Sequence, residues 1–373
     1  MASRERSLEA RSTSFLPGSE RGNVVKAFVI RGRHDAVVTD RPQPTPQPGQ
    51  ALIKVHACGI CGSDLHAYEG TQPFFRYPEV PGHEVVGTVM EVRPRPEGLL
   101  RLPNRPVEEN LQPGDRVVLD PAMPCGKCYP CTHGRYNCCE NQQVIGVHAP
   151  GALAEYYLAP LECLHRVPAE LSDDQAALVE PLSIGVEANN RGRTGPEDAV
   201  LIIGAGTIGL CVMLVAKARG ARVALSDLSA ARREKALELG ADAAFDPREE
   251  GFMSALKDFS GGSGPSLVVE AVGTPGTVAQ ALDLVVHAGR VVLLGLISSD
   301  ITIPGNVMVK KELDFLGSRL HGGTIPQAIE LIARGQVDVL PLLTHGLELA
   351  QAEEALKLMG EAPERILKAV VRL

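Results

Sequence analysis

Apolar runs alternate with amphipathic segments in the second half of this chain, and this alternation limits the fold more than any other feature. The runs AVLIIG, ARVALSD, SLVVEAV and RVVLLGL are apolar almost throughout, as strands buried on both faces are. Helical patterns such as IGLCVMLVAKARG and SAARREKALELG lie between them. Strand and helix in alternation build βαβ units, which assemble into a doubly wound parallel sheet. We therefore expect an α/β domain over residues 182–318.

A glycine motif lies where the first of these strands meets its helix. Gly204, Gly206 and Gly209 in VLIIGAGTIGL have the spacing for a tight turn, close approach to a pyrophosphate and close helix–strand packing. The helix N-terminus offers free N–H groups to phosphates. Asp227 ends the next strand, 18 residues after Gly209, where a carboxylate binds both ribose hydroxyls and disfavours a 2′-phosphate. The pattern predicts a Rossmann domain that prefers NAD to NADP. Asp227 as a simple helix cap is the alternative, and Arg232 is placed to cover the adenine.

The first part of the chain has a different pattern. Over residues 24–166, short β-branched runs such as VVKAFVI, ALIKVHA, HEVVGTVMEV and DRVVLD are bounded by Pro and Gly, which predicts β-structure. The four prolines of RPQPTPQPGQ exclude a helix there. The segment Arg93–Asn110, rich in Pro and Arg, is interpreted as an inserted surface loop.

The chain ends with two helical patterns, residues 324–334 and 348–359, and the strand-like ILKAVVRL. We expect this tail to return to the first domain. The predicted organisation is therefore a flexible extension over residues 1–23, a β-rich domain made of 24–181 with 319–373, and the coenzyme domain between them.

Charge and composition exclude several classes of partner. The 37 Lys and Arg against 45 Asp and Glu give a net charge of −8, which argues against nucleic acid or an anionic membrane as the main partner. With no Trp and 4% aromatic residues, base-stacking platforms are not expected. The start of the chain lacks the apolar core of a secretory signal, and glycines and Lys217 interrupt the apolar run 199–218. We expect a soluble cytoplasmic protein that binds a small molecule.

Nine cysteines in an intracellular chain are expected to be thiols or metal ligands, and five of them cluster. Cys125, Cys128, Cys131 and Cys139 have the spacing C-x2-C-x2-C-x7-C. Four thiolates complete the tetrahedral shell of zinc and leave no open position, which predicts a structural site. Cys138 gives a poorer spacing than Cys139. A cluster of buried apolar cysteines and a zinc ribbon are the alternatives, although a ribbon needs a wider gap between two CxxC pairs.

A second donor set is scattered along the chain. Cys61 lies in CGICGSDLH, His83 and Glu84 in PGHEVVG, and Glu180 in EPLSIG. A mixed set of thiolate, imidazole and carboxylate is typical of zinc sites that keep a position open for chemistry. Asp64, three residues after Cys61, is expected to orient the imidazole of His83.

Together these motifs resemble the zinc-dependent medium-chain dehydrogenase/reductase family, from about Val24 to the end of the chain. The resemblance implies a GroES-like β-rich catalytic domain, split in sequence around a Rossmann coenzyme domain, with the active site between the two. It implies one catalytic zinc and one structural zinc per subunit. It also implies that Ser63 takes the substrate proton and that His66 passes it to solvent. Glu180 stands where alcohol dehydrogenases carry a second Cys, as in the polyol and threonine dehydrogenase branches. The resemblance further implies a homodimer or homotetramer.

Several stretches, GTQPFFRYPEVPGHEVVG, NCCENQQVIGVH, KKELDFLGSR and LLTH, resemble the L-galactonate/L-gulonate 5-dehydrogenase branch, which oxidises sugar acids. Arg319, in GSRL, resembles the position where polyol dehydrogenases carry a substrate-binding Arg, with a surface salt bridge as the alternative. Arg76 is interpreted as a surface residue, although it is also placed to reach the cleft. Phe74 and Phe75 fit either the pocket wall or the core. The resemblance assigns further residues to the cofactor: Thr207, Ile208, Gly295, Leu296 and Ser318.

The sequence thus predicts an oxidoreductase that moves a hydride from a secondary alcohol of a sugar acid or polyol to NAD⁺. Zinc lowers the pKa of bound water from about 15.7 to about 7, and we expect a similar decrease for a bound alcohol. A decrease of ~9 pKa units corresponds to a free energy on the order of 12 kcal/mol. General acid–base catalysis accelerates a reaction by roughly 10²–10⁴-fold, so we expect the metal to make the larger contribution to the rate. The alternatives are an L-threonine 3-dehydrogenase, a sorbitol- or galactitol-type polyol dehydrogenase, a non-catalytic nucleotide sensor and a zinc-ribbon nucleic-acid binder.

Overall fold

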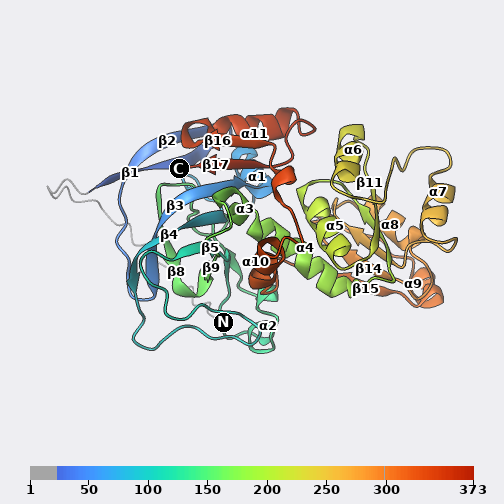
Figure 1. Cartoon of the computed structure of the whole chain (residues 1–373), viewed down its shortest axis with the longest axis horizontal. Helices are drawn as coiled ribbons and strands as arrows, with labels where there is room; N and C mark the ends of the chain where they lie inside the picture. The colour runs from blue at the N-terminus through green and yellow to red at the C-terminus, as the bar shows by residue number, and fades with distance from the viewer. Residues whose placement is uncertain (1–22, 298) are drawn as a thin grey trace, which may run out of the picture.

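The computed structural model describes residues 23–297 and 299–373. Two lobes lie side by side, each built on its own sheet (Figure 1). One lobe contains the strands of the first part of the chain and the last two strands, and the other contains the strands between them. The extension predicted over residues 1–23 lies outside the described residues, except for Asn23.

The coenzyme lobe is a six-stranded parallel sheet in the order β12-β11-β10-β13-β14-β15. This is the order of a doubly wound Rossmann sheet, so the predicted fold class is confirmed. Its central strand β10 is buried along its whole length, as its unbroken apolar run predicts. The strands are β10 Ala199–Ile203, β11 Arg222–Ser226, β12 Ala243–Phe245, β13 Leu267–Glu270, β14 Arg290–Leu293 and β15 Asp314–Gly317. The helices are α5 Thr207–Ala218, α6 Ala230–Glu238, α7 Phe252–Phe259, α8 Pro275–Leu284 and α9 Gly305–Lys311.

The other lobe is built on a seven-stranded sheet in the order β16-β17-β3-β4-β5-β9, with β8 also paired to β3. All its pairings are antiparallel except β16 with β17. The strands are β3 Gln50–Ile60, β4 Glu84–Arg93, β5 Arg116–Leu119, β8 Tyr156–Pro160, β9 Leu164–Arg166, β16 His345–Glu348 and β17 Ala369–Arg372. Two smaller sheets pair β1 Val24–Gly32 with β2 Asp35–Pro42, and β6 Ala122–Met123 with β7 Gln143–Val144.

The end of the chain joins the first sheet, because β17 pairs with β3 and places Ala369 opposite Ile60. This register brings the residue before Ala369 next to the residue after Ile60. The two predicted helices of the tail are present with slightly different bounds. The helices outside the coenzyme sheet are α1 Gly62–Glu69, α2 Tyr129–Thr132, α3 Asp173–Ala177, α4 Val179–Gly192, α10 Ile325–Ala333 and α11 Ala352–Glu361.

Helix α4 packs closely on α5 of the coenzyme lobe. A Cβ on Gly185 would lie 2.7 Å from the backbone carbonyl of Cys211, so only glycine permits this approach. The side-chain amide of Asn189 donates to the carbonyls of Gly185 and Val212, at 2.8 and 3.0 Å. The first turn of α4 carries Glu180, and this packing fixes its position.

The segment Arg93–Asn110 is not a simple surface loop as predicted. Leu102 and Arg105 are only 9% and 7% exposed. The charge of Arg105 is tolerated inside because its guanidinium donates to the carbonyl of Ala122, at 2.9 Å, and lies 3.4 Å from the carboxylate of Asp120. A sequence rich in Pro and Arg does not reveal such a partner.

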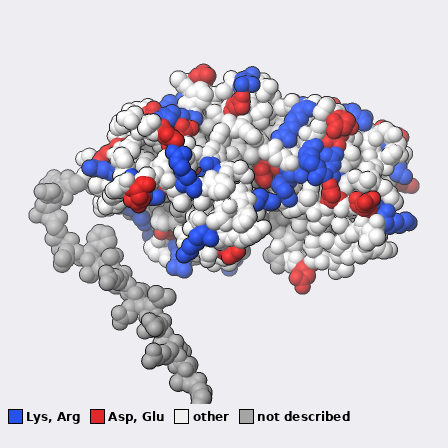
Figure 2. Space-filling model, turned by 90° about the horizontal axis from the view of Figure 1, so that it is seen from below, with Lys and Arg blue, Asp and Glu red and all other residues white. Residues whose placement is uncertain are grey.

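The surface has charges of both signs. Figure 2 shows Lys and Arg interspersed with Asp and Glu over the face that it presents. The apolar run 199–218 is divided between β10 and α5. Within the part of the chain that the structure describes, no helix combines the length and apolar character needed to cross a membrane.

Candidate active site

The sheet register brings the mixed donor set together. Cys61 follows β3 and is the N-cap of α1, and Glu84 begins β4 opposite Gly59 of β3. Ligand atoms of Cys61, His83 and Glu84 all lie within 4.8 Å of one another. A Cβ on Gly59 would lie 1.9 Å from Oε2 of Glu84, so the glycine makes room for this carboxylate. Neighbouring antiparallel strands thus assemble a group that is spread over 24 residues of sequence.

Negative charge accumulates at this group. Burial lowers the pKa of His83, but Cys61, Asp64 and Glu180 outweigh it and raise the pKa to about 10. Among the described residues, Nδ1 of His83 has no hydrogen-bond partner. A half-buried thiol beside a buried carboxylate and a buried imidazole with an unpartnered ring nitrogen is suited to a divalent cation such as zinc.

Lys368 is a functional residue that the sequence analysis missed. Its buried ammonium forms an ion pair with Glu84 and donates to the carbonyl of Ile60, at 3.0 Å. Burial lowers the pKa of Lys368, but Glu84 and Cys61 raise it further, so its pKa lies above the ordinary value. A single Lys within the apolar strand ILKAVVRL was the available indication, because a cation at such a position needs a buried anion.

Asp64 holds the backbone around the site. Its two carboxylate oxygens accept from the N–H groups of Cys61, at 2.8 Å, and Gly82, at 3.1 Å. The predicted partner was the imidazole of His83, whereas these hydrogen bonds go to the backbone on either side of the ligands. Asp64 therefore fixes the start of α1 and the loop before His83.

Glu180 is buried on α4 but is not one of the three residues whose donor atoms lie within 4.8 Å. Burial raises its pKa, His83 lowers it and Glu84 raises it. The structure thus places this carboxylate within electrostatic reach of the group and leaves the donor set with three members.

The two predicted proton-transfer residues lie on α1. The hydroxyl of Ser63 is buried and has no partner among the described residues. His66 is exposed, and its Nδ1 lies 3.1 Å from the hydroxyl of Thr71. Residues three apart lie on the same side of a helix, and of these two the first is partly buried and the second is exposed.

The four-cysteine group forms within one loop. Donor atoms of Cys125, Cys128, Cys131 and Cys139 lie within 4.8 Å of one another. The sulfur of Cys128 is 3.4 Å from that of Cys131 and 3.7 Å from that of Cys139. Backbone N–H groups lower the pKa of Cys125 to about 6, which favours a thiolate. Cys138 lies outside the group, with its sulfur 3.8 Å from the guanidinium of Arg135.

A cavity of about 580 Å³ lies at the carboxyl ends of the coenzyme strands. Gly204 has a φ of +101°, and a Cβ on Gly209 would lie 2.0 Å from the carbonyl oxygen of Gly204. A Cβ on Gly206 would meet nothing within 4 Å, so this position leaves space for a pyrophosphate. The predicted cofactor residues that line the cavity are Gly204, Gly206, Asp227 and Arg232.

The carboxylate of Asp227 accepts from the backbone N–H groups of Ala205, at 2.8 Å, and Ser229, at 2.9 Å. Its position on the cavity wall is therefore fixed. A guanidinium nitrogen of Arg232 lies 3.9 Å from the same carboxylate.

The other predicted cofactor residues lie outside this cavity. The hydroxyl of Thr207 donates to the carbonyl of Leu367, at 2.6 Å, next to the lysine that pairs with Glu84. This hydrogen bond joins the glycine-motif helix to the mixed donor set. Ile208 and Gly209 lie in the first turn of α5, and Gly295, Leu296 and Ser318 follow β14 and β15.

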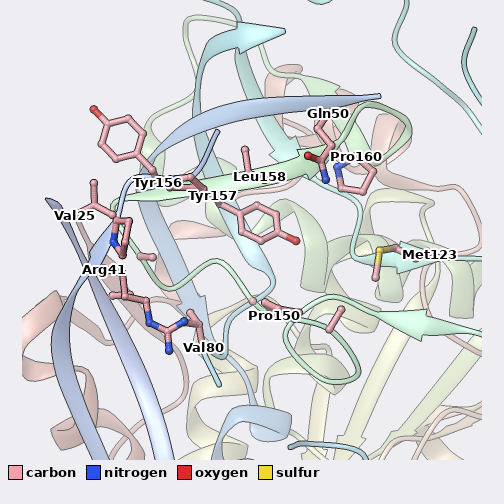
Figure 3. Close-up of a pocket in the computed structure, with 16 residues that line it drawn as sticks. Val25, Arg41, Gln50, Val80, Met123, Pro150, Tyr156, Tyr157, Leu158 and Pro160 are labelled. Atoms are coloured by element: carbon pink, nitrogen blue, oxygen red, sulfur yellow. The ribbon is translucent and has the colours of Figure 1, made fainter. Parts of the chain in front are cut away.

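The predicted substrate residues divide into two kinds. Phe74 is 57% exposed and stacks on His148 with ring centroids 4.7 Å apart, whereas Phe75 is buried in the core. Arg319 is exposed, and its Nε donates to the carbonyl of Asn137, at 3.2 Å. Arg76 is exposed and makes no hydrogen bond or ion pair within the described ranges. A separate cavity of about 430 Å³ beside β8 contains none of the predicted site residues (Figure 3).

Known proteins match both lobes. Residues 47–169 match the alcohol dehydrogenase GroES-like domain, and residues 207–334 match the zinc-binding dehydrogenase model. The L-galactonate-5-dehydrogenase of Escherichia coli K12 is 34% identical over 89% of this chain and 94% of its own length. The chain belongs to the zinc-dependent medium-chain dehydrogenase/reductase family. It is accordingly an alcohol or polyol dehydrogenase that uses zinc and a nicotinamide dinucleotide.

Other relatives show the range of the family. The L-threonine 3-dehydrogenase of Pyrococcus horikoshii is 37% identical over 85% of this chain and 89% of its own length. A crystal structure of the alcohol dehydrogenase rspB from E. coli CFT073, complexed with NADH, is 30% identical. It has a TM-score of 0.85 and covers 94% of this chain and 100% of its own.

Proposed function

We propose that this dehydrogenase oxidises a secondary hydroxyl of a sugar acid of the L-galactonate or L-gulonate type, with NAD⁺ as the hydride acceptor. The observation that carries the proposal is the state of Arg319. Only its Nε makes a hydrogen bond to a described residue, and its guanidinium faces no carboxylate partner there. An exposed, unpaired guanidinium fixed by a backbone carbonyl is well suited to a planar carboxylate.

We assign the metal to Cys61, His83 and Glu84, with Glu180 as a further ligand. Zinc held there would supply a Lewis acid that lowers the pKa of the substrate hydroxyl. The buried hydroxyl of Ser63 relays the proton, because it accepts one from the substrate hydroxyl as it passes its own on toward His66, whose exposed imidazole exchanges a proton with solvent. Lys368 compensates the charge of Glu84 and so limits the negative charge of the pocket. We assign the four cysteines to a structural zinc.

The cofactor preference rests on Asp227. A carboxylate whose oxygens are held by two N–H groups cannot turn away from a 2′-phosphate, so NAD is preferred. Asp227→Ala is expected to raise the ratio of NADP to NAD efficiency by on the order of 10–100-fold, about 1.4–2.8 kcal/mol. The measurement is kcat/KM with each cofactor. The variant Asp227→Asn, which keeps the shape and removes the charge, separates repulsion from loop disorder, and an unaltered ratio in both would place the ribose elsewhere.

The second candidate is an L-threonine 3-dehydrogenase, favoured by the 37% identity to the Pyrococcus enzyme. Threonine carries an ammonium as well as a carboxylate, so its site needs an anion that a sugar-acid site does not. Polyols such as sorbitol and galactitol need neither charge.

One experiment tests the proposal. NADH formation is measured with L-galactonate, L-gulonate, L-idonate, sorbitol, galactitol and L-threonine, with and without a zinc chelator. We expect chelator-sensitive oxidation of an aldonate. Arg319→Met should then raise KM for the aldonate by roughly tenfold, the value of one charge-assisted contact, while Arg76→Met should not. Oxidation of polyols or threonine alone would reject the sugar-acid assignment and keep the reaction class.

We further propose that the enzyme acts in the cytoplasm as a homodimer or homotetramer. The oligomeric state rests on the family resemblance, and the location rests on the expectation drawn from the sequence pattern. Light scattering of the purified protein tests the oligomeric state.

A further inference from the structure

The insertion between β4 and β5 places a charged residue inside the protein. The side chain of Arg105 is 2% exposed. One of its terminal nitrogens donates to the carbonyl of Ala122, at 2.9 Å, and lies 3.4 Å from Oδ2 of Asp120. Its guanidinium carbon is 5.2 Å from the ring centroid of Tyr136. A cation–π contact and an ion pair at one residue define the orientation of this side chain closely.

The carboxylate of Asp120 also contacts His321, a residue of the distant tail. Oδ1 of Asp120 lies 2.9 Å from Nε2 of His321, which is fully buried. The hydroxyl of Thr324 donates to the carbonyls of His321, at 2.6 Å, and Ser183 of α4, at 2.7 Å. Arg105 and Asp120 thereby fix the turn that joins β15 to α10.

Close packing supports the same connection. A Cβ on Gly323 would lie 2.7 Å from the carbonyl oxygen of Asn104, so the insertion touches the backbone of this turn. Leu102 packs with Cys131 and Tyr136 in the apolar cluster beside the four-cysteine group. The insertion therefore contacts both the four-cysteine group and the turn at residues 319–324.

Arg319 begins this turn, and two hydrogen bonds join it to Asn137 in the four-cysteine loop. The side-chain amide of Asn137 donates to the carbonyl of Arg319, at 2.8 Å, while Nε of Arg319 donates to the carbonyl of Asn137, at 3.2 Å. His321, two residues later, is linked to Arg105 through one intervening side chain, that of Asp120.

We propose that Arg105 is a positioning residue for substrate recognition. Through Asp120 and His321 it holds the turn at residues 319–324, and so sets where the guanidinium of Arg319 meets the substrate carboxylate. The inference rests on the substrate role of Arg319 given under the proposed function.

A structural role alone explains Arg105 poorly. Replacing a buried ion pair by apolar side chains of similar volume is often neutral or stabilising, so stability gives little reason to bury a guanidinium here. Orientation does, because the ion pair specifies direction and distance, whereas apolar packing leaves the turn free to shift. Displacement of a binding group by 1 Å is enough to cost up to about 10²-fold.

The test compares Arg105→Met with Arg101→Met. Arg101 lies in the same insertion, but its side chain is 64% exposed and, among the described residues, paired only with Glu109. We expect Arg105→Met to raise KM for the aldonate by on the order of tenfold, with kcat and NADH affinity within about twofold of wild type. Arg101→Met should leave all three unchanged. Arg105→Lys, which keeps the charge and loses the planar geometry, should lie between the two and serves if Arg105→Met does not fold.

The double variant Arg105→Met/Arg319→Met decides the route. If Arg105 acts through Arg319, the second substitution adds no further increase in KM to that of Arg319→Met. If the folded Arg105 variants have a lower melting temperature but an unchanged KM, Arg105 has only a structural role. If the increases in KM of the two single variants add in the double variant, Arg105 does not act through Arg319. An unchanged KM in Arg319→Met would instead overturn the substrate role of Arg319, and the positioning role with it.

Discussion

The two donor groups differ in how they are built and in what surrounds them. Four thiols come from fifteen consecutive residues and lie against an apolar cluster that includes Leu102, Ala122 and Tyr136. Cys61 follows β3, His83 precedes β4 and Glu84 begins β4, and the three lie among the buried charges of Asp64, Glu180 and Lys368. A donor set that completes the metal shell needs only a loop. A set that leaves room for substrate needs neighbouring charges of both signs to hold it in shape.

The largest expected effect belongs to the mixed set. Cys61→Ser should lower kcat by on the order of 10³-fold or more, because the Lewis acid contributes several kcal/mol. Steady-state kinetics measures this loss, and metal analysis should find one zinc fewer per chain. NADH binding, the control, should remain near wild type, and the melting temperature should fall no further than that of the chelated wild-type protein. A rate close to normal would mean that the metal does not act at this group.

Lys368→Met tests the charges around the mixed set. Removing one partner of a buried ion pair leaves Glu84 uncompensated, which should destabilise the metal-free protein by about 3–5 kcal/mol. Denaturant unfolding of the chelated protein measures this loss, and added zinc should recover more stability than in wild type. Lys357→Met, at an exposed pair with Glu353, should cost under about 1 kcal/mol. Equal effects of the two substitutions would contradict the charge argument.

Cys128→Ser tests the four-thiol group. A loss of about 3 kcal/mol should lower the melting temperature by roughly 5–10 °C, with kcat of the folded enzyme nearly unchanged. Cys138→Ser is the matched control, since this adjacent thiol lies outside the group, and its melting temperature should not move. Unchanged unfolding in Cys128→Ser would refute a structural metal there.

The smallest effect concerns His165, buried in β9 beside the network of Arg105. Burial lowers its pKa, Asp120 raises it, and His321 and Arg105 lower it, to about 4 in total. The unfolded imidazole has a pKa near 6.5, so below that pH the unfolded state binds the extra proton. Stability should therefore fall as the pH drops from about 6.5 to 4, by at most on the order of 3 kcal/mol. Urea unfolding at a series of pH values should show a shallower loss in His165→Gln, and parallel curves would exclude this residue as the cause.

Local patterns predicted the parts of the molecule that local chemistry builds. The buried run AVLIIG became β10, and the glycines after it form the turn and the close helix contact that their spacing requires. The four-cysteine group likewise follows from its spacing. The prediction of the mixed set depended on its joint presence with the four-cysteine loop and the coenzyme fold, because no short spacing connects Cys61 to His83 or Glu180.

The missed features all depend on partners that are distant in sequence. Lys368 is 284 residues from Glu84, and Arg105 is linked to His321 of the tail through Asp120. The insertion looked like surface because Arg and Pro are usually exposed, and the carboxylate that permits its burial lies fifteen residues away.

The sequence by itself determined the doubly wound coenzyme sheet, the pyrophosphate turn and the four-thiol loop. The reason is that the hydrophobic period, the glycine spacing and the cysteine spacing each specify a structure formed by residues that are close together in the sequence. Only the tertiary structure decided which charges compensate the mixed donor set and how the inserted segment joins the turn that carries Arg319. Burial of a charge depends on a partner of opposite sign in space, and a linear pattern does not specify where that partner will be.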